Sequence, residues 1–428
     1  MTFSFIHLAD IHLGRPFSDL PELGEKKELC NQACTRSFNK ITDLAISKKV
    51  DFVLIAGDSF DSEEHDLSSK LLFRENLKRL ADNGIKSYII CGNHDSIEVY
   101  KKNESYFRFD SKYDGLINIT GVNTPENIEA YKPIDGVNIY SASFKGDESE
   151  NQLKYLPKID DKNSKDFNIG LLHCDLDKTE SKYAPTSRED LRNLGYDYYA
   201  LGHIHIPEVK ESGAVKIVYA GSPQGRTKKE TGAHGCYYAE VNGKTVEKLE
   251  FIPTDFVRFS TMDIDCSDCE NKLDVFEEIT NSTSNINEDA ELSLLEINLL
   301  GVTNAYKDLT ESENLIEEYR QNFGDIGKTA VYRINNDTVP CVNESEFAED
   351  NGIIGIIHRG VENGEINLGE IYDNISEIHE AIYKKLGLDS ESKDFLTASL
   401  KVDKEEITES AKKEIKSLCS EIYSIDKV

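Results

Sequence analysis

Several features are missing from this sequence of 428 residues, and each absence narrows the possibilities. It contains no long apolar run, and its mean hydropathy is -0.49, so we expect no membrane span. The first residues, MTFSFIHLAD, have no basic region before the apolar stretch, which predicts a first β-strand in place of a secretory signal. No internal repeat, proline-rich linker or low-complexity tract is present. These absences favour a soluble globular protein.

Cysteine usage argues against a disulfide framework. The nine cysteines are an odd number and are scattered singly, apart from Cys266 and Cys269. That pair lacks a second pair of thiolates, so a surface turn is favoured over a zinc site. We therefore expect a reducing, cytoplasmic environment.

The chain also lacks a P-loop of the form GxxxxGK[ST], so we expect that it cannot power mechanical work with ATP by itself. Charge is distributed unevenly. The formal net charge is -30; residues 1–258 carry 41 acidic and 34 basic side chains, whereas residues 259–428 carry 38 and 15. The acidic C-terminal part is interpreted as a solvated surface and as a region that repels phosphate and leaves nucleic acid to the N-terminal part or a partner. The two interpretations are compatible.

The length predicts two or three domains, and apolar periodicity suggests where they lie. Residues 1–255 alternate strand-like and helix-like segments, the rhythm of an α/β domain. Residues 256–336 read as a small β-α-β-α-β capping domain, in which Thr310 and Glu313 form a capping-box pattern. Residues 337–428 are acidic and mostly helical by pattern, with apolar stripes over 375–386 and 407–422.

Five short segments of the N-terminal part concentrate the residues able to do chemistry. Each follows an apolar strand: ADIH at 9–12, GDSFD at 57–61, GNHD at 92–95, LLHCD at 171–175 and GHIH at 202–205. Functional groups gather at the carboxyl ends of strands in open α/β sheets, so five strand ends can converge on one site. We expect Asp-x-His and His-x-His side chains to point to the same side, as alternate residues of a strand do.

The predicted cluster is a catalytic metal site. Its mixed oxygen and imidazole ligands suit Mn²⁺, Fe²⁺ or Zn²⁺ better than Ca²⁺, and the lack of thiolates argues against structural zinc. A carboxylate such as Asp58 can bridge two ions about 3.5 to 4 Å apart, the spacing that clamps a phosphoryl group. The candidate ligands are the Asp, Asn and His side chains of these five segments.

In these five segments and their order, the sequence resembles the calcineurin-like metallophosphoesterase superfamily, with its pattern D-x-H, GD-x-x-D, GNH[DE], a lone His and GHxH. The resemblance implies a four-layer α/β/β/α sandwich. It also implies that Asp10, His12, Asp58 and His205 hold one ion, and that Asp58, Asn93, His173 and His203 hold the second. By similarity His94 is catalytic, assisting departure of the leaving oxygen, and Asp95 orients it. Asp61 is either a supporting carboxylate near the ions or a turn residue.

Flanking residues select a branch of the superfamily. Residues 5–17, 57–62 and 220–241 resemble SbcD- and YhaO-type DNA-repair exonuclease subunits. Protein phosphatases continue GD with an aromatic residue and place Arg and Gly after the second Asp, which GDSFDSEE does not. The resemblance implies a Mn²⁺-dependent 3′–5′ exonuclease or endonuclease in DNA repair or defence, in which a hydroxide shared by two ions attacks the phosphodiester. A metallophosphatase or small-molecule phosphodiesterase is the alternative.

Partners follow from the same resemblance. It implies DNA as substrate and an SMC-like ATPase as partner, and it leaves a homodimer open. The C-terminal amphipathic segments either dock that partner or pack on their own domain. Arg226, Lys228 and Lys229 follow the last strand that feeds the site, so we expect them to contact a phosphate backbone or, in the simpler interpretation, to be solvated.

Overall fold

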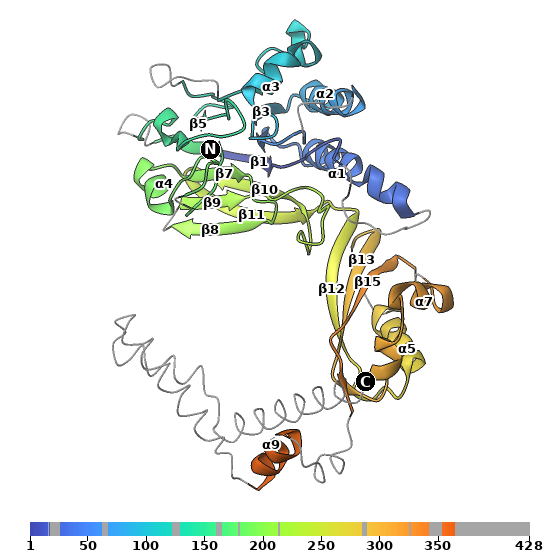
Figure 1. Ribbon diagram of the computed structural model, residues 1–428. Coiled ribbons are helices and arrows are strands. Elements are labelled where there is room, and N and C mark those ends of the chain that lie inside the picture. Colours follow the sequence, from blue (N-terminus) through green and yellow to red (C-terminus); the bar gives the residue numbers. More distant parts are fainter. Residues whose placement is uncertain are drawn as a thin grey trace. The chain divides into compact units, whose positions relative to one another are not determined.

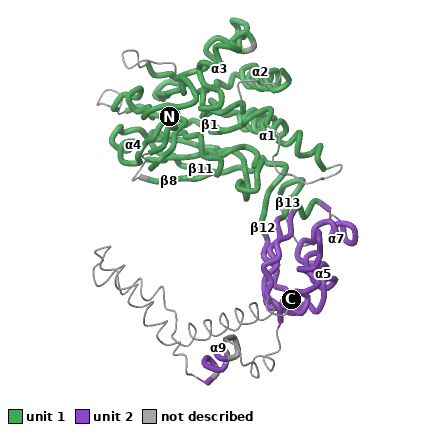
Figure 2. The backbone as a smooth tube through the Cα atoms, viewed as in Figure 1, with its two compact units in different colours: residues 1–261, 287–295, 328–332 green, residues 262–286, 296–327, 333–428 purple. Residues whose placement is uncertain are grey.

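The computed structural model is described for residues 1–15, 17, 26–61, 67–121, 129–159, 165–178, 180–212, 215–284, 289–324, 327–341 and 353–363. Contacts divide the chain into two compact units, coloured separately in Figure 2. The first comprises residues 1–261, 287–295 and 328–332, and the second comprises 262–286, 296–327 and 333–428. No helix in the described part of the chain is both long and apolar enough to cross a membrane.

Two sheets form the centre of the first unit (Figure 1). The six-stranded sheet has the order β11 (Thr245–Pro253), β10 (Gly235–Asn242), β1 (Thr2–Leu8), β2 (Phe52–Ala56), β3 (Lys86–Ile90) and β4 (Ile117–Ile119). The five-stranded sheet has the order β5 (Val137–Ser141), β6 (Phe167–His173), β7 (Tyr198–Gly202), β9 (Val215–Tyr219) and β8 (Glu208–Ser212). Strands β1 to β4 pair in parallel, as do β5, β6, β7 and β9. Their carboxyl ends therefore lie at one edge of each sheet.

The inner faces of the two sheets pack against each other. One buried cluster combines Phe5 and Phe52 of the first sheet with Ile169 and Tyr198 of the second. The rings of Phe5 and Phe52 stack with centroids 5.2 Å apart, and Phe5 meets Tyr198 edge to face at 5.1 Å. This apolar interior fixes the two sheets relative to each other.

Helices cover the two outer faces. Helix α1 (Lys26–Lys48) and helix α2 (Leu67–Asp82) pack on the first sheet through a cluster that includes Phe38 and Phe73. Helix α4 (Arg188–Leu194) contributes Leu191 to the cluster on the second sheet. The short helix α3 (Ile97–Lys102) follows β3. The four-layer α/β/β/α sandwich predicted from the sequence is confirmed.

The remaining elements follow β11 in the chain. They are β12 (Val257–Asp265), α5 (Lys272–Ser284), β13 (Leu292–Leu300), β14 (Val302–Thr303), α6 (Tyr306–Thr310), α7 (Leu315–Asn322), β15 (Thr329–Asn336), β16 (Val339–Pro340) and α9 (Ile353–Glu362). Strands β12, β13 and β15 form one sheet, in the predicted order of strands and helices. The predicted helical stripes at 375–386 and 407–422 lie outside the described residues.

The predicted capping box at Thr310 was wrong. Thr310 is the last residue of α6, where its hydroxyl donates to the Tyr306 carbonyl oxygen at 2.9 Å. Helix α7 begins five residues later, and the Asn314 side chain caps it by accepting from the Glu317 N–H. Asn is as good an N-cap as Thr, so a cap search based on Thr and Glu alone selected the wrong residue.

Candidate metal centre

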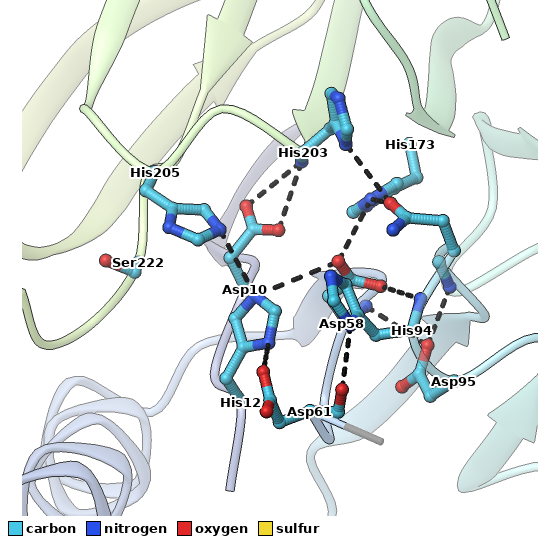
Figure 3. Close-up of polar contacts among 12 residues, drawn as sticks. Asp10, His12, Asp58, Asp61, His94, Asp95, His173, His203, His205 and Ser222 are labelled. Carbon is cyan, nitrogen blue, oxygen red and sulfur yellow. Dashed lines mark hydrogen bonds and ion pairs between the residues drawn. The ribbon is translucent and has the colours of Figure 1, made fainter. Parts of the chain in front are cut away.

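The seven predicted ligands come together at the edge where the parallel strands end. Asp10 and His12 follow β1, Asp58 follows β2 and Asn93 follows β3. From the second sheet, His173 is the last residue of β6, and His203 and His205 follow β7. Figure 3 shows the Asp10, His12, Asp58, His173, His203 and His205 side chains converging. The face-to-face packing of the sheets thus brings five strand ends to one place.

The local backbone differs from the predicted strand alternation. Asp10, His12, Asp58 and His203 have φ values of 52°, 46°, 49° and 96°, in the region that favours glycine. After β1, β2 and β7 the side chains converge because the chain turns sharply there, not because they alternate along a strand. Such conformations cost about 1–3 kcal/mol each and cluster at functional sites, where the surrounding structure enforces them.

One group of ligand atoms gathers around His12. The side chains of Asp10, His12 and His205 each offer one ligand atom, and these atoms lie within 4.8 Å of one another. The Nε2 atoms of His12 and His205 are 3.2 Å apart. The Asp58 Oδ2 atom lies 3.8 Å from His12 Nε2, on the side facing the second group.

The second group gathers around Asn93. Its Oδ1 atom lies 3.0 Å from His173 Nε2 and 3.2 Å from His203 Nδ1. The same Asp58 Oδ2 that faces His12 is 3.4 Å from His173 Nε2. One carboxylate oxygen therefore lies between two groups of ligand atoms, the arrangement that a bridging carboxylate requires.

Each of the four imidazoles turns its other ring nitrogen toward a protein oxygen. The pairs are His12 Nδ1 with Asp61 Oδ1 at 3.2 Å, His173 Nδ1 with the Ala56 carbonyl oxygen at 2.9 Å, His203 Nε2 with Asp175 Oδ2 at 3.4 Å, and His205 Nδ1 with Glu230 Oε1 at 2.6 Å. Metal-binding histidines almost always have such an outer acceptor, which fixes the ring and its tautomer. The donor set therefore fits divalent ions.

Burial and neighbouring charges shift the pKa values of the ligand side chains. Burial alone would raise the pKa of Asp58, but the charge of His173 and a hydrogen bond from that ring outweigh it and hold the pKa below its usual range. Burial would lower the pKa of His173, but Asp58 raises it to about 9. Burial lowers the pKa of His12 to about 3 and that of His203 to about 4. Neutral rings and a carboxylate are the forms that bind metal, and binding would displace the His173 proton.

His94 lies beside the first group, with its ring centroid 5.0 Å from that of His12. Its backbone N–H donates to Asp58 Oδ1 at 2.9 Å, and its Nδ1 lies 2.7 Å from the Asp61 carbonyl oxygen. A carbonyl oxygen only accepts, so Nδ1 carries a proton and Nε2 is left for other work. Asp61, whose role the sequence left open, thus contacts His94 through its carbonyl and His12 through its carboxylate.

Asp95 has a different surrounding from the one expected of a group that orients His94. Its carboxylate is buried and accepts backbone N–H groups from Ser59 and Gly92, each at 2.7 Å, and from Asp58 at 3.2 Å. Burial and the nearby Asp58 charge raise its pKa to about 6. Asp95 therefore joins the loops after β2 and β3, and its role in orienting His94 stays a prediction.

Burial separates the three basic residues predicted to contact DNA. Lys228 and Lys229 are exposed, whereas the Arg226 side chain is only 1% exposed. Arg226 in this position cannot contact a phosphate backbone, so that prediction is corrected. The pattern of the segment gave no warning, because three basic residues in a row of four resemble a solvated patch.

Sequence reasoning also missed the outer carboxylates of Asp175 and Glu230. Asp175 belongs to one of the five segments, two residues after His173, but the pattern assigned it no role. Glu230 is 25 residues from His205, a contact that no local spacing reveals. Its only local signal is an acidic residue four positions after Arg226 in a glycine-rich segment.

Comparison with known proteins agrees with this geometry. The calcineurin-like phosphoesterase model matches residues 3–207. The metallophosphoesterase YhaO of Bacillus subtilis is 30% identical over 288 residues, covering 66% of this chain and 68% of YhaO. The chain therefore belongs to the calcineurin-like phosphoesterase family, whose fold carries a two-metal site, and SbcD/YhaO-type proteins are among its relatives.

Two other relatives have names that refer to DNA or to a nuclease. The DNA double-strand break repair protein Mre11 of Methanopyrus kandleri is 26% identical over 280 residues, covering 59% of this chain and 57% of that protein. The SbcD component of the nuclease SbcCD of Bacillus subtilis is 29% identical over 92 residues, covering 21% of this chain and 22% of that protein. The chain thus spans less than two thirds of both.

The close approach of Gly92 to Asp58 allows a test of the site. A Cβ at position 92 would lie 2.1 Å from Asp58 Oδ1, so Gly92→Ala must displace that carboxylate. We expect the Mn²⁺ affinity, measured by isothermal titration calorimetry, to fall about 10- to 100-fold, which is the loss typical when a residue that supports a metal ligand is removed. Gly146→Ala, where nothing lies within 4 Å, is the matched control. Equal Mn²⁺ affinities in the two variants would contradict this view of Asp58.

Proposed function

We propose that this chain is a metal-dependent DNA nuclease that hydrolyses phosphodiesters with two divalent ions, Mn²⁺ in the first instance. The observation that carries the proposal is the position of Asp58 between two converging groups of ligand atoms. One ion is assigned to Asp10, His12, Asp58 and His205, and the other to Asp58, Asn93, His173 and His203. Open oxygen and imidazole sites of this kind belong to catalysts.

When bound, the ions would supply the nucleophile by lowering the pKa of coordinated water toward neutrality, and they would bind phosphate oxygens. His94 supplies the proton. The Asp61 carbonyl holds its Nδ1–H at 2.7 Å, so in the protonated ring Nε2–H donates to the departing sugar oxygen. Asp61 couples this ring to His12, because its carboxylate lies 3.2 Å from His12 Nδ1. The acid is therefore positioned relative to the ligands of the first ion.

Variants of His94 and Asp58 separate catalysis from metal binding. We expect His94→Ala to bind both ions and to cleave DNA about 10²–10⁴-fold more slowly, because only the proton donor is lost. Asp58→Ala should lose both ions along with activity. Cleavage of end-labelled DNA with and without Mn²⁺, with metal content measured in parallel, checks both expectations. Undiminished turnover by His94→Ala would overturn its assignment.

The choice of DNA as substrate is supported by the names of the relatives and by the flanking segments that resemble DNA-repair exonucleases. Protein phosphatases and small-molecule phosphodiesterases can use the same site. A panel of labelled DNA, bis-p-nitrophenyl phosphate and a phosphopeptide, each with Mn²⁺, distinguishes these classes. Preference for the phosphopeptide would replace the nuclease by a phosphatase.

Lys228 and Lys229 are exposed basic side chains in the segment after β9, and Ser222 of that segment contacts the His205 backbone. If they contact the phosphate backbone, Lys228→Glu with Lys229→Glu should weaken DNA binding and reduce its salt dependence by about one unit of slope per lost contact. Fluorescence anisotropy with labelled DNA at several salt concentrations measures both quantities. An unchanged slope would mean that the two lysines are solvated. Lys132→Glu with Lys154→Glu, at two other exposed lysines, controls for the same change in net charge.

An ATPase partner completes the proposal. The chain has no P-loop of its own, and one relative is named as a subunit of the nuclease SbcCD. We propose an SMC-like ATPase as the partner and the segment after residue 367 as its docking region. Deletion of residues 368–428 should abolish co-purification with the ATPase and leave Mn²⁺ binding intact. Retained co-purification would place the docking region elsewhere.

We also propose that the protein works in the cytoplasm. Eight cysteines lie in the described residues; all are free, and seven of them are buried. Free buried thiols are usual where the surroundings are reducing, and burial raises the pKa of several of these thiols, including Cys174 and Cys236, each to about 12.

A further inference from the structure

Glu230 lies between a ligand of the first group and a buried cation. Its Oε1 atom is 2.6 Å from His205 Nδ1, and its Oε2 atom accepts the Arg226 backbone N–H at 2.6 Å. The residue is only 8% exposed. Both carboxylate oxygens are therefore engaged away from solvent, and one of them is aimed at His205.

The contact with Glu230 determines which ring nitrogen of His205 is free to bind the first ion. A carboxylate accepts, so Nδ1 of His205 carries the proton and Nε2 keeps its lone pair. That Nε2 faces His12 Nε2 at 3.2 Å. His12 Nδ1 lies 3.2 Å from another carboxylate oxygen, Asp61 Oδ1. With Nδ1 protonated in both rings, both Nε2 lone pairs turn toward one point, as two ligands of a common cation do.

The loop that carries Glu230 also fixes the backbone of His205. Ser222 N–H donates to the His205 carbonyl oxygen at 2.8 Å. The buried ring of His234 joins the two ends of the loop, with Nδ1 3.0 Å from Ser222 Oγ and Nε2 3.2 Å from the Glu230 carbonyl oxygen. The loop therefore holds His205 by both its main chain and its ring.

Arg226 places a positive charge beside the Glu230 carboxylate. Its guanidinium Nη2 lies 4.0 Å from Glu230 Oε1, and its side chain is only 1% exposed. Within the described residues, its Nε, Nη1 and Nη2 atoms have no hydrogen-bond partner. A buried cation without hydrogen bonds is costly unless its charge is compensated, and Glu230 is the carboxylate that faces it.

We propose that Glu230 is a positioning residue for His205 and that Arg226 holds the Glu230 carboxylate in place, so that this pair sets the affinity of the first ion. The inference rests on the proposed two-ion site. It assigns residues 226–230 to support of the metal centre, in place of the DNA contact expected of Arg226. Cleavage of DNA is not required for the inference to hold.

The test uses the full chain and Mn²⁺ alone, titrated by calorimetry. The wild type should bind two ions in two steps. Glu230→Gln keeps the size of the side chain and removes the anion, so one step should weaken about 10- to 100-fold while the other changes less than about threefold. Asp175→Asn is the matched control, since Asp175 Oδ2 faces His203 of the second group at 3.4 Å. It should weaken the other step.

A second variant, at Arg226, tests the same pair of residues independently. Arg226→Met removes the charge and retains most of the volume, so it should weaken the same step as Glu230→Gln. In the double variant the two effects should not add, because both act through one carboxylate. Wild-type affinity in Glu230→Gln, equal weakening of both steps, or full additivity with Arg226→Met would each overturn the proposal. If the wild type binds two ions but leaves DNA intact, the proposed function fails and this inference stands.

Discussion

The Asp58 carboxylate lies between two groups of ligand atoms, 3.8 Å from His12 Nε2 and 3.4 Å from His173 Nε2, and the rest of the centre is arranged around it. His12 comes from the end of a strand in the first sheet, and His173 ends a strand in the second. Asp58 can face both only because the apolar cluster of Phe5, Phe52 and Tyr198 holds the sheets face to face. The hydrophobic interior thus determines the spacing of polar atoms at its edge.

Assembling such a centre costs free energy through backbone strain and the burial of charged groups, and contacts with neighbouring residues offset this cost. Four ligands have left-handed backbone conformations, and several carboxylates and imidazoles are buried side by side. Asp95 ties the Asp58 loop to the Gly92 loop through three backbone hydrogen bonds. Each ligand imidazole has a protein oxygen behind it. These contacts hold the ligands in place before any ion arrives, which is how supporting residues raise metal affinity.

The sequence predicted much of this because the informative residues are local. Strands that end in Asp, Asn or His could be recognised one at a time, and their order identified the family. The features that the sequence did not reveal are of two kinds: strands with a weak pattern, and contacts between residues far apart in the chain. The three-residue β4 and the polar β8 are too short or too exposed to show a strand pattern. Arg226 could not be recognised as buried, nor Glu230 as a partner of His205, since folding alone brings those groups together.

The most direct measurement of the central claim is a crystal soaked in Mn²⁺ and recorded at a wavelength where manganese scatters anomalously. The account predicts two anomalous peaks about 3.5 to 4 Å apart with Asp58 between them. One peak should contact His12 and His205, and the other should contact Asn93 and His173. A single peak away from Asp58, for example among His12, Asp61 and His94, which also bring ligand atoms within 4.8 Å of one another, would contradict it.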